Sequence, residues 1–202
     1  MKDFGFYLVI TNPVVGYARC AEAAVRAGVR IVQRLMKHAA REDILREARE
    51  MRRVTRGTDT LFIVNDDPAL AAEAEADGVH VGQDDMSPVE VRAKFPQLKV
   101  VGLSTHNLDQ VRASWDQPID YIGVGPVYAT PTKDIPDPTL GPEMAGRMIA
   151  AARVPAVAIG GINAETLPPV LAAGARNFAV VRAVCQSQDP YSAICKLLEI
   201  HA

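Results

Sequence analysis

The chain has 202 residues, a length that favours one folded domain, here residues 1–202, with a substantial core. Hydrophobic residues make up 49% and charged residues 23%, the balance of a globular protein. The net charge of −2 provides no basic surface, so nucleic acid is excluded as the expected partner.

The expected compartment follows from the N-terminus and the cysteines. The N-terminal segment has one short apolar run before a turn, unlike a signal peptide, and no apolar run is long enough to span a bilayer. Cys20, Cys185 and Cys195 are odd in number and lack the spacing of a metal site, which suits a reducing compartment. We therefore expect a cytoplasmic protein with no membrane partner.

Short apolar runs alternate with amphipathic or alanine-rich stretches along the chain. We expect strands at residues 7–11, 30–37, 61–64, 78–81, 100–104, 119–124, 156–159 and 177–181. The helices are expected at residues 17–27, 41–56, from the Asn-Asp-Asp-Pro of residues 65–68 through residue 76, from 87 onward, 107–115, 141–152, 164–173 and 191–200. Eight such units predict an α/β protein, a single (β/α)8 TIM barrel with a parallel sheet inside its helices. An open doubly wound sheet is the alternative, but no Gly-x-Gly-x-x-Gly follows the first strand.

Polar residues follow most of the expected strands, at the end where a barrel of this kind carries its active site. Gln33 and Lys37 share one face if the second strand is regular. The other strand ends contribute Asn65 and Asp66, residues 80–85, residues 104–106, residues 130–133, Gly160-Gly161, and Val181-Arg182. Together they predict a site for phosphorylated small molecules.

Two aspartates in this set, Asp66 and Asp85, are hard oxygen ligands from neighbouring strand ends. They suit Mg²⁺ whose shell is completed by substrate phosphates, although either residue could instead cap a helix. Lysines, threonine hydroxyls and glycine-rich backbone suit phosphate oxygens. His80 and His106 are more typical of structural histidines at such positions.

A proline-punctuated loop follows the sixth expected strand and carries Thr130, Thr132 and Lys133. Its three prolines and its lack of apolar periodicity predict an ordered lid over residues 129–140. An ordinary solvent loop rich in turn formers is the alternative.

Four segments closely resemble the thiamine-phosphate synthase family, and they run in order along nearly the whole chain. They are Asn65-Asp66, GVHVGQDD at residues 78–85, GVGPVYATPTK at residues 123–133, and AIGGI at residues 158–162. The resemblance implies a transferase of thiamine biosynthesis on a (β/α)8 barrel. Such an enzyme joins hydroxymethylpyrimidine diphosphate to hydroxyethylthiazole phosphate with release of pyrophosphate, the C–O bond breaking before the thiazole nitrogen attacks.

The resemblance also implies roles for single residues. Mg²⁺ on the pyrophosphate would be bound by Asp66 and Asp85. The pyrimidine diphosphate would be held by Gln33, Lys37, Asn65, Ser104 and Lys133, of which Lys37, Ser104 and Lys133 are the expected catalytic groups. The thiazole phosphate would be held by Thr130, Thr132, Gly161 and the main chain at Val181. No general base is required, because the attacking nitrogen is already a nucleophile and the protein acts by charge and position.

Two positions depart from the family pattern. The family has Gln-x-Arg-x-Lys after the second strand, and here Leu35 stands at the arginine position. Arg34 lies on the other face unless a bulge turns it inward, and the lost phosphate contact would cost about 1.5–3 kcal/mol. Arg182 stands where a serine is common. We expect it to strengthen phosphate binding, with pairing to a neighbouring acid as the alternative.

Two other functions compete with the synthase. The related thiazole tautomerase tends to carry Gly-His where this chain has Gly125-Pro126, and His106 would be its candidate for proton transfer. A non-catalytic barrel that senses thiazole or thiamine phosphate is supported only by Leu35. A homodimer is also expected, although no sequence signature marks an interface.

Overall fold

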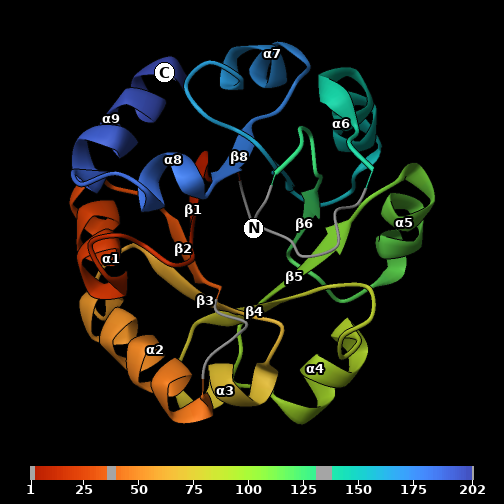
Figure 1. The fold of residues 1–202 in the computed structure, drawn as a ribbon. Helices are drawn as coiled ribbons and strands as arrows, with labels where there is room; N and C mark the ends of the chain where they lie inside the picture. Colours follow the sequence, from red (N-terminus) through yellow and green to blue (C-terminus); the bar gives the residue numbers. More distant parts are fainter. Residues whose placement is uncertain (1–2, 36–39, 131–137, 202) are drawn as a thin grey trace.

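The computed structural model describes residues 3–35, 40–130 and 138–201, and its eight strands form one closed parallel barrel in sequence order. Helices surround the sheet on the outside (Figure 1). The strands are β1 (Phe6–Ile10), β2 (Ile31–Arg34), β3 (Leu61–Asn65), β4 (Gly78–Val81), β5 (Val100–Thr105), β6 (Tyr121–Val124), β7 (Ala156–Ala158) and β8 (Asn177–Val180). Because β1 pairs with both β2 and β8, the sheet has no edge and the predicted (β/α)8 barrel is confirmed.

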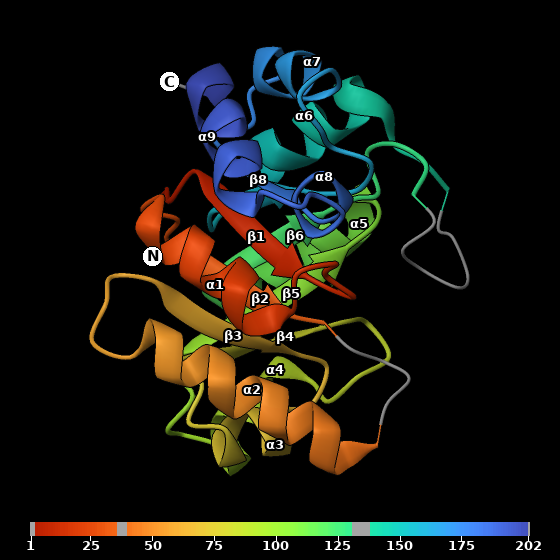
Figure 2. The ribbon, with the colours of Figure 1, turned by 60° about the vertical axis from the view of Figure 1, so that its left-hand side comes forward.

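The helices follow the strands as predicted, with two short additions. They are α1 (Tyr17–Arg26), α2 (Arg41–Thr55), α3 (Pro68–Glu73), α4 (Pro88–Lys94), α5 (Leu108–Ala113), α6 (Gly141–Ala151), α7 (Leu167–Ala172) and α9 (Pro190–His201). The additions are the 3₁₀ turn η1 (Ser114–Asp116) and α8 (Arg182–Cys185). Figure 2 shows α1 and α2 packed side by side along the outside of the sheet. Within the described ranges no helix is both long and apolar enough to cross a membrane.

Several helices begin at side-chain caps. The side chain of Asp67 accepts a hydrogen bond from the Leu70 N–H (2.8 Å), and the Asn107 side chain accepts one from the Gln110 N–H (2.9 Å). At α4, Ser87 and Glu90 form a capping box just before Pro88. Such caps satisfy the first N–H groups of a helix, which fixes where each helix leaves its loop.

Side chains of the strands are buried on both faces of the sheet. One set points into the barrel and packs as an inner core of Tyr7, Val9, Ile31, Ile63, Val100, Tyr121, Val157 and Ala179. The alternate set, with Leu8, Phe62 and Ile122 among its members, packs against the helices. Burial on both faces explains why the strands are nearly continuous apolar runs in the sequence.

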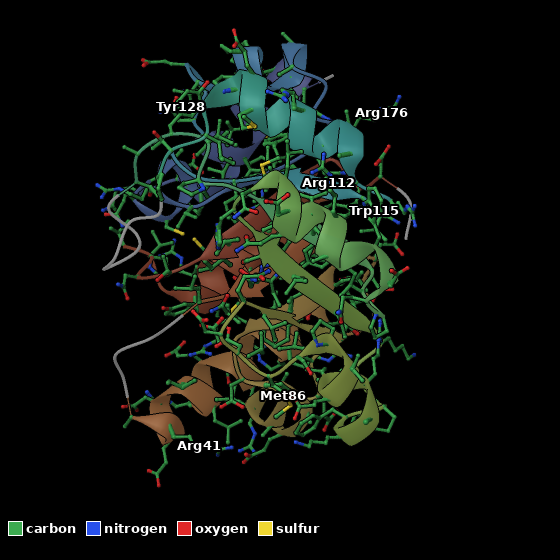
Figure 3. The ribbon with its side chains drawn as sticks, turned by 90° about the vertical axis from the view of Figure 1, so that its right-hand side faces the viewer. Arg41, Met86, Arg112, Trp115, Tyr128 and Arg176 are labelled. Atoms are coloured by element: carbon green, nitrogen blue, oxygen red, sulfur yellow. The ribbon has the colours of Figure 1, made fainter. Side chains whose placement is uncertain are left out.

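The two ends of the barrel differ in character. In Figure 3, Tyr128, which follows β6, and Arg176, which precedes β8, lie at opposite ends of the molecule. The end on which Tyr128 lies collects the loops that leave the carboxyl ends of the strands. Most of the predicted site residues that the structure describes line a cavity at this end.

Candidate active site

A cavity of about 520 Å³ lies at the carboxyl ends of the strands. Its deep part is formed by inner-core residues of the barrel, including Tyr7, Val9, Tyr121 and Val157. Among its lining residues are seven that the sequence predicts as ligand contacts, namely Gln33, Asn65, Ser104, Thr130, Gly161, Val181 and Arg182. These seven come from six different strand ends, so the barrel brings together residues that lie far apart in the sequence.

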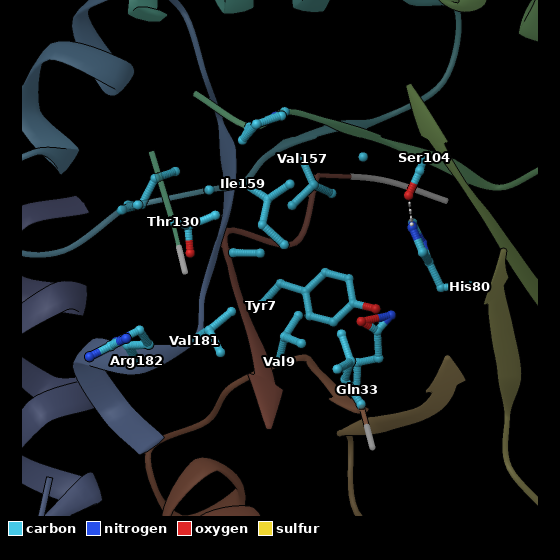
Figure 4. A pocket seen from close by; sticks show the side chains of 18 of the residues that line it. Tyr7, Val9, Gln33, His80, Ser104, Thr130, Val157, Ile159, Val181 and Arg182 are labelled. Carbon is cyan, nitrogen blue, oxygen red and sulfur yellow. Dashed lines mark hydrogen bonds between the residues drawn. The ribbon is translucent and has the colours of Figure 1, made fainter. Parts of the chain in front are cut away.

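Polar groups lie at two opposite sides of this cavity. Figure 4 shows Thr130 and Arg182 on one side, and His80 and Ser104 on the other. Apolar side chains, Val157 and Ile159 among them, lie between the two sides. The cavity therefore offers two polar subsites separated by an apolar wall.

The second strand is regular, so Arg34 does not reach the cavity. The pairing of β2 with β3 is unbroken, with Gln33 opposite Ile63 and Arg34 opposite Val64. Gln33 and Leu35 line the cavity, whereas Arg34 is only 2% exposed on the outer face of the sheet. The possibility that a bulge turns Arg34 inward is therefore wrong.

Arg34 is buried in an unusual environment. Burial lowers the pKa of its guanidinium, and the charges of Tyr17, Glu47 and Asp67 raise it. Its Nε and Nη2 atoms have no hydrogen-bond partner among the described residues. Arg34 is thus a cation of the outer core, with its charge directed away from the cavity.

The predicted metal ligands lie just outside the lining of the cavity. Asp66 follows β3 with φ of 63°, and its backbone N–H donates to the carbonyl oxygen of His80 (2.8 Å). Asp85 follows β4 and is exposed, and its Oδ2 accepts a hydrogen bond from the Gly82 N–H (2.7 Å). The caps of α3 and α4 are Asp67 and Ser87, so the assignment of Asp66 or Asp85 as a helix cap is wrong.

The two aspartates suit a metal that is bound together with a substrate. The described residues contain no group of three or more histidine, cysteine or acidic side chains able to hold an ion by themselves. Mg²⁺ is commonly bound by one or two carboxylates together with substrate phosphates and water. Carboxylates at the adjacent ends of β3 and β4 fit that pattern.

Both histidines near the cavity make defined hydrogen bonds. His106 Nδ1 lies 2.6 Å from the carbonyl oxygen of Gly125, so Nδ1 carries a proton and donates it. His80 Nε2 lies 2.9 Å from Ser104 Oγ, and His80 Nδ1 lies 3.0 Å from the hydroxyl of Tyr121. Neither Tyr121 nor Tyr7 is among the site residues predicted from the sequence, although both are polar residues at inner-face positions of apolar strands.

The glycine pair after β7 has a backbone that only glycine adopts easily. Gly160 and Gly161 have φ of 104° and 66°. A Cβ on Gly161 would lie 2.7 Å from the Cβ of Tyr128, closer than carbon atoms approach. The pair therefore presents bare backbone to the cavity, as predicted.

Three predicted site residues, Lys37, Thr132 and Lys133, lie outside the described residues. The centre of the expected lid, at residues 131–137, lies outside them too. The roles of these residues stay predictions.

Comparison with known proteins agrees with this geometry. The profile of the thiamine monophosphate synthase family matches residues 6–184. A thiamine-phosphate synthase of Synechococcus sp. (strain WH7803) is 44% identical over 179 residues, covering 89% of this chain and 50% of that protein. One of Archaeoglobus fulgidus is 36% identical over 202 residues, covering 99% of this chain and 95% of that protein.

The fold comparison gives the same result. The structure of a thiamine phosphate pyrophosphorylase from Pyrococcus furiosus is similar with a TM-score of 0.88 at 27% identity, covering 98% of this chain and 96% of that one. The chain spans about half the length of the cyanobacterial relatives it matches, and nearly all of the archaeal one. From its sequence and its fold, the chain belongs to the thiamine monophosphate synthase family.

Proposed function

We propose that this chain is a thiamine-phosphate synthase. It would condense 4-amino-5-hydroxymethyl-2-methylpyrimidine diphosphate with hydroxyethylthiazole phosphate to give thiamine phosphate and pyrophosphate. The observation that carries the proposal is the cavity itself, where residues from six strand ends form two polar subsites in a member of this family.

The subsite around Gln33 and Ser104 suits the aminopyrimidine ring. Gln33 is only 4% exposed, so its amide is held in place and offers both a donor and an acceptor. Val9 and Val157 supply apolar surface beside it. Apolar walls with a few fixed polar groups are typical of sites for flat heteroaromatic rings.

The opposite subsite suits the thiazole phosphate. Thr130 provides a hydroxyl, Gly161 provides backbone, and Arg182 provides positive charge. None of the described carboxylates forms an ion pair with Arg182, which favours its role as a phosphate ligand over a pairing with a neighbouring acid. Guanidinium and hydroxyl donors are suited to phosphate oxygens.

The chemistry would be driven by charge and position. Mg²⁺ bound by Asp66 and Asp85 would neutralise the departing pyrophosphate. The cavity walls would hold the pyrimidine carbon and the thiazole nitrogen in line, so that the nitrogen captures the carbon once the C–O bond breaks. Lys37 and Lys133 are predicted to add positive charge on the leaving group.

The test is the identity of the product. The purified chain is incubated with both substrates and Mg²⁺, and the products are identified by mass spectrometry, with either substrate omitted as the control. Thiamine phosphate that forms only with both substrates supports the proposal. Isomerised thiazole phosphate without thiamine phosphate, or binding without any product, would contradict it.

Assembly and location stay predictions. A homodimer is expected in solution, and light scattering from the purified protein would give its mass. A cytoplasmic location is expected as well, and cell fractionation would test it.

A further inference from the structure

Four side chains form a continuous chain of hydrogen bonds across the barrel interior. Tyr7 Oη lies 2.8 Å from Tyr121 Oη, Tyr121 Oη lies 3.0 Å from His80 Nδ1, and His80 Nε2 lies 2.9 Å from Ser104 Oγ. This hydrogen-bond chain runs from Tyr7 on β1 through Tyr121 on β6 and His80 on β4 to Ser104 on β5, at the cavity. Figure 4 shows its last link, between His80 and Ser104.

The buried end of the chain sets the direction of every link. Among the described residues, Tyr121 is the hydrogen-bond partner of the hydroxyl of Tyr7, a residue that is only 2% exposed. A buried hydroxyl that keeps its proton donates it, so Tyr7 donates to the oxygen of Tyr121. Burial raises the pKa of both phenols, so both remain protonated at ordinary pH.

The remaining links follow in order. Since Tyr121 Oη accepts from Tyr7, its own proton is available for His80 Nδ1, which must then be the unprotonated nitrogen. A ring whose Nδ1 accepts a hydrogen bond carries its proton on Nε2, and that proton is donated to Ser104 Oγ. With its oxygen already accepting, the Ser104 hydroxyl has its proton left to donate into the cavity.

We propose that Tyr121 and Tyr7 are positioning residues that hold His80 in its Nε2–H tautomer and thereby make the Ser104 hydroxyl a donor to the bound substrate. The partner of Ser104 is then a hydrogen-bond acceptor atom of the pyrimidine diphosphate. The identity of that partner rests on the proposed function, whereas the tautomer of His80 does not.

The backbone of β5 is shaped to admit this chain. A Cβ on Gly102 would lie 2.2 Å from Cζ of Tyr121 and 2.5 Å from Nδ1 of His80. The rings of His80 and Tyr121 stack above this glycine, with centroids 5.4 Å apart and planes 28° apart. Any side chain at residue 102 would push the two rings apart, so the glycine is a structural requirement of the link.

The direction of the chain matters for the reaction. A serine that accepts a hydrogen bond would favour donor groups of a ligand, such as an amino group. A serine that donates favours ring nitrogens or phosphate oxygens, and its bond to a leaving-group oxygen would strengthen as negative charge develops there. The hydrogen-bond chain thus makes Ser104 a donor toward the cavity before any ligand binds.

The first test measures the tautomer directly. The full chain is labelled with ¹⁵N, and the ring signals of His80 are assigned by their loss in His80→Gln. We expect a pyridine-type signal from Nδ1 and a pyrrole-type signal from Nε2. A pyrrole-type signal from Nδ1, alone or together with one from Nε2, would overturn the proposal.

The second test uses three single-hydroxyl variants. Tyr121→Phe should lose the tautomer preference and lower kcat/KM for the pyrimidine diphosphate by about tenfold, the scale of one hydrogen bond, while KM for the thiazole phosphate is unchanged. Tyr7→Phe leaves Tyr121 Oη able to accept from Nδ1 as well as to donate to it, so this variant should weaken the tautomer preference and lower kcat/KM for the pyrimidine diphosphate by less than Tyr121→Phe does. Tyr191→Phe, on α9 at the outer surface, is the matched control and should match the wild type.

The outcomes separate this inference from the proposed function. An inactive wild-type chain with the predicted tautomer would contradict the synthase activity and leave the tautomer assignment standing. An active wild-type chain whose kcat/KM is unaffected by Tyr121→Phe would contradict the positioning role.

Discussion

At the residue scale, Leu35 is the unusual member of the cavity. It lies on the inner face with Gln33, at the position where the family resemblance predicts an arginine on the pyrophosphate. Leucine cannot neutralise a phosphate, and the neighbouring Arg34 points to the outer core instead. If the proposed function holds, the charge of the diphosphate would be neutralised by Mg²⁺ and by the predicted lysines.

Restoring the arginine should strengthen substrate binding. Leu35→Arg is expected to lower KM for the pyrimidine diphosphate by about tenfold, because a guanidinium–phosphate hydrogen bond contributes about 1.5–3 kcal/mol before its ordering cost. Steady-state kinetics with the thiazole phosphate held saturating would measure it. Leu35→Met keeps the side chain neutral and should not lower KM. A KM for Leu35→Arg that equals or exceeds the wild-type value would contradict this prediction.

A substitution of Arg182 tests the role of the opposite subsite in binding the thiazole phosphate. Arg182→Gln should raise KM for the thiazole phosphate by about tenfold and leave KM for the diphosphate unchanged, since one exposed cation on the phosphate is lost. Arg176→Gln is the matched control, because Arg176 is exposed at the other end of the barrel. Equal effects of Arg182→Gln on both KM values would show that Arg182 is not specific for the thiazole phosphate.

Among the helices and strands, two similar sets of hydrogen bonds, here called clamps, hold together the end of the barrel opposite the cavity. Asp77, before β4, accepts hydrogen bonds from the Phe62 N–H and from Arg52 of α2. Asp120, before β6, accepts from the Val101 N–H and from Arg92 of α4. Each clamp joins a helix to two neighbouring strands, so it stabilises the barrel without contacting the cavity.

The hydrogen bonds of Arg92 are expected to contribute to the stability of the fold and not to substrate binding. The guanidinium donates to Asp120 Oδ2 (2.6 Å) and to three backbone carbonyl oxygens. Arg92→Met should lower the free energy of unfolding by about 2 kcal/mol, because these partly buried acceptors lose their donors. Chemical denaturation would measure the loss, with KM for both substrates unchanged.

An exposed ion pair provides the comparison for this clamp. Arg112 pairs with Asp109 on α5, with side chains 59% and 92% exposed. Arg112→Met should change the free energy of unfolding by less than about 0.5 kcal/mol. If Arg92→Met lowered the free energy of unfolding no more than Arg112→Met does, the hydrogen bonds of Arg92 would not stabilise the barrel.

The strands could be predicted from the sequence because burial on both faces makes them apolar runs. The fourth strand was predicted at residues 78–81, where the structure has it. Helix α8 was missed because its four residues are too short to show a periodicity and no side chain caps them. The second strand was expected to reach residue 37, but it ends at Arg34, because an apolar run alone does not show where strand pairing stops.

The site could be predicted in part for a related reason. Residues at strand ends, such as Asn65, Ser104 and Gly161, are predictable because a closed barrel brings all strand ends together. The pairing of Tyr7 with Tyr121 depends instead on which inner side chains meet across the barrel. Sequence alone does not give that cross-barrel geometry, so these two residues were missed.

At the scale of the whole molecule, the barrel separates stability from chemistry. The clamps at Asp77 and Asp120 lie at the amino ends of the strands, and the cavity lies at their carboxyl ends. This division allows the site loops to carry strained or charged residues, such as Asp66 with its positive φ, while the far end maintains the fold.

Pyrophosphate release is the reaction to measure first, because the proposed function is a Mg²⁺-assisted displacement of pyrophosphate in this cavity. The rate is measured with both substrates, with Mg²⁺ and then with excess chelator, for the wild type and for Asp66→Asn. We predict release in a one-to-one ratio with thiamine phosphate, its loss in chelator, and a large drop in Asp66→Asn that added Mg²⁺ only partly restores. Release that persists in chelator would contradict the role of Mg²⁺, and no release with Mg²⁺ and both substrates present would contradict the synthase activity.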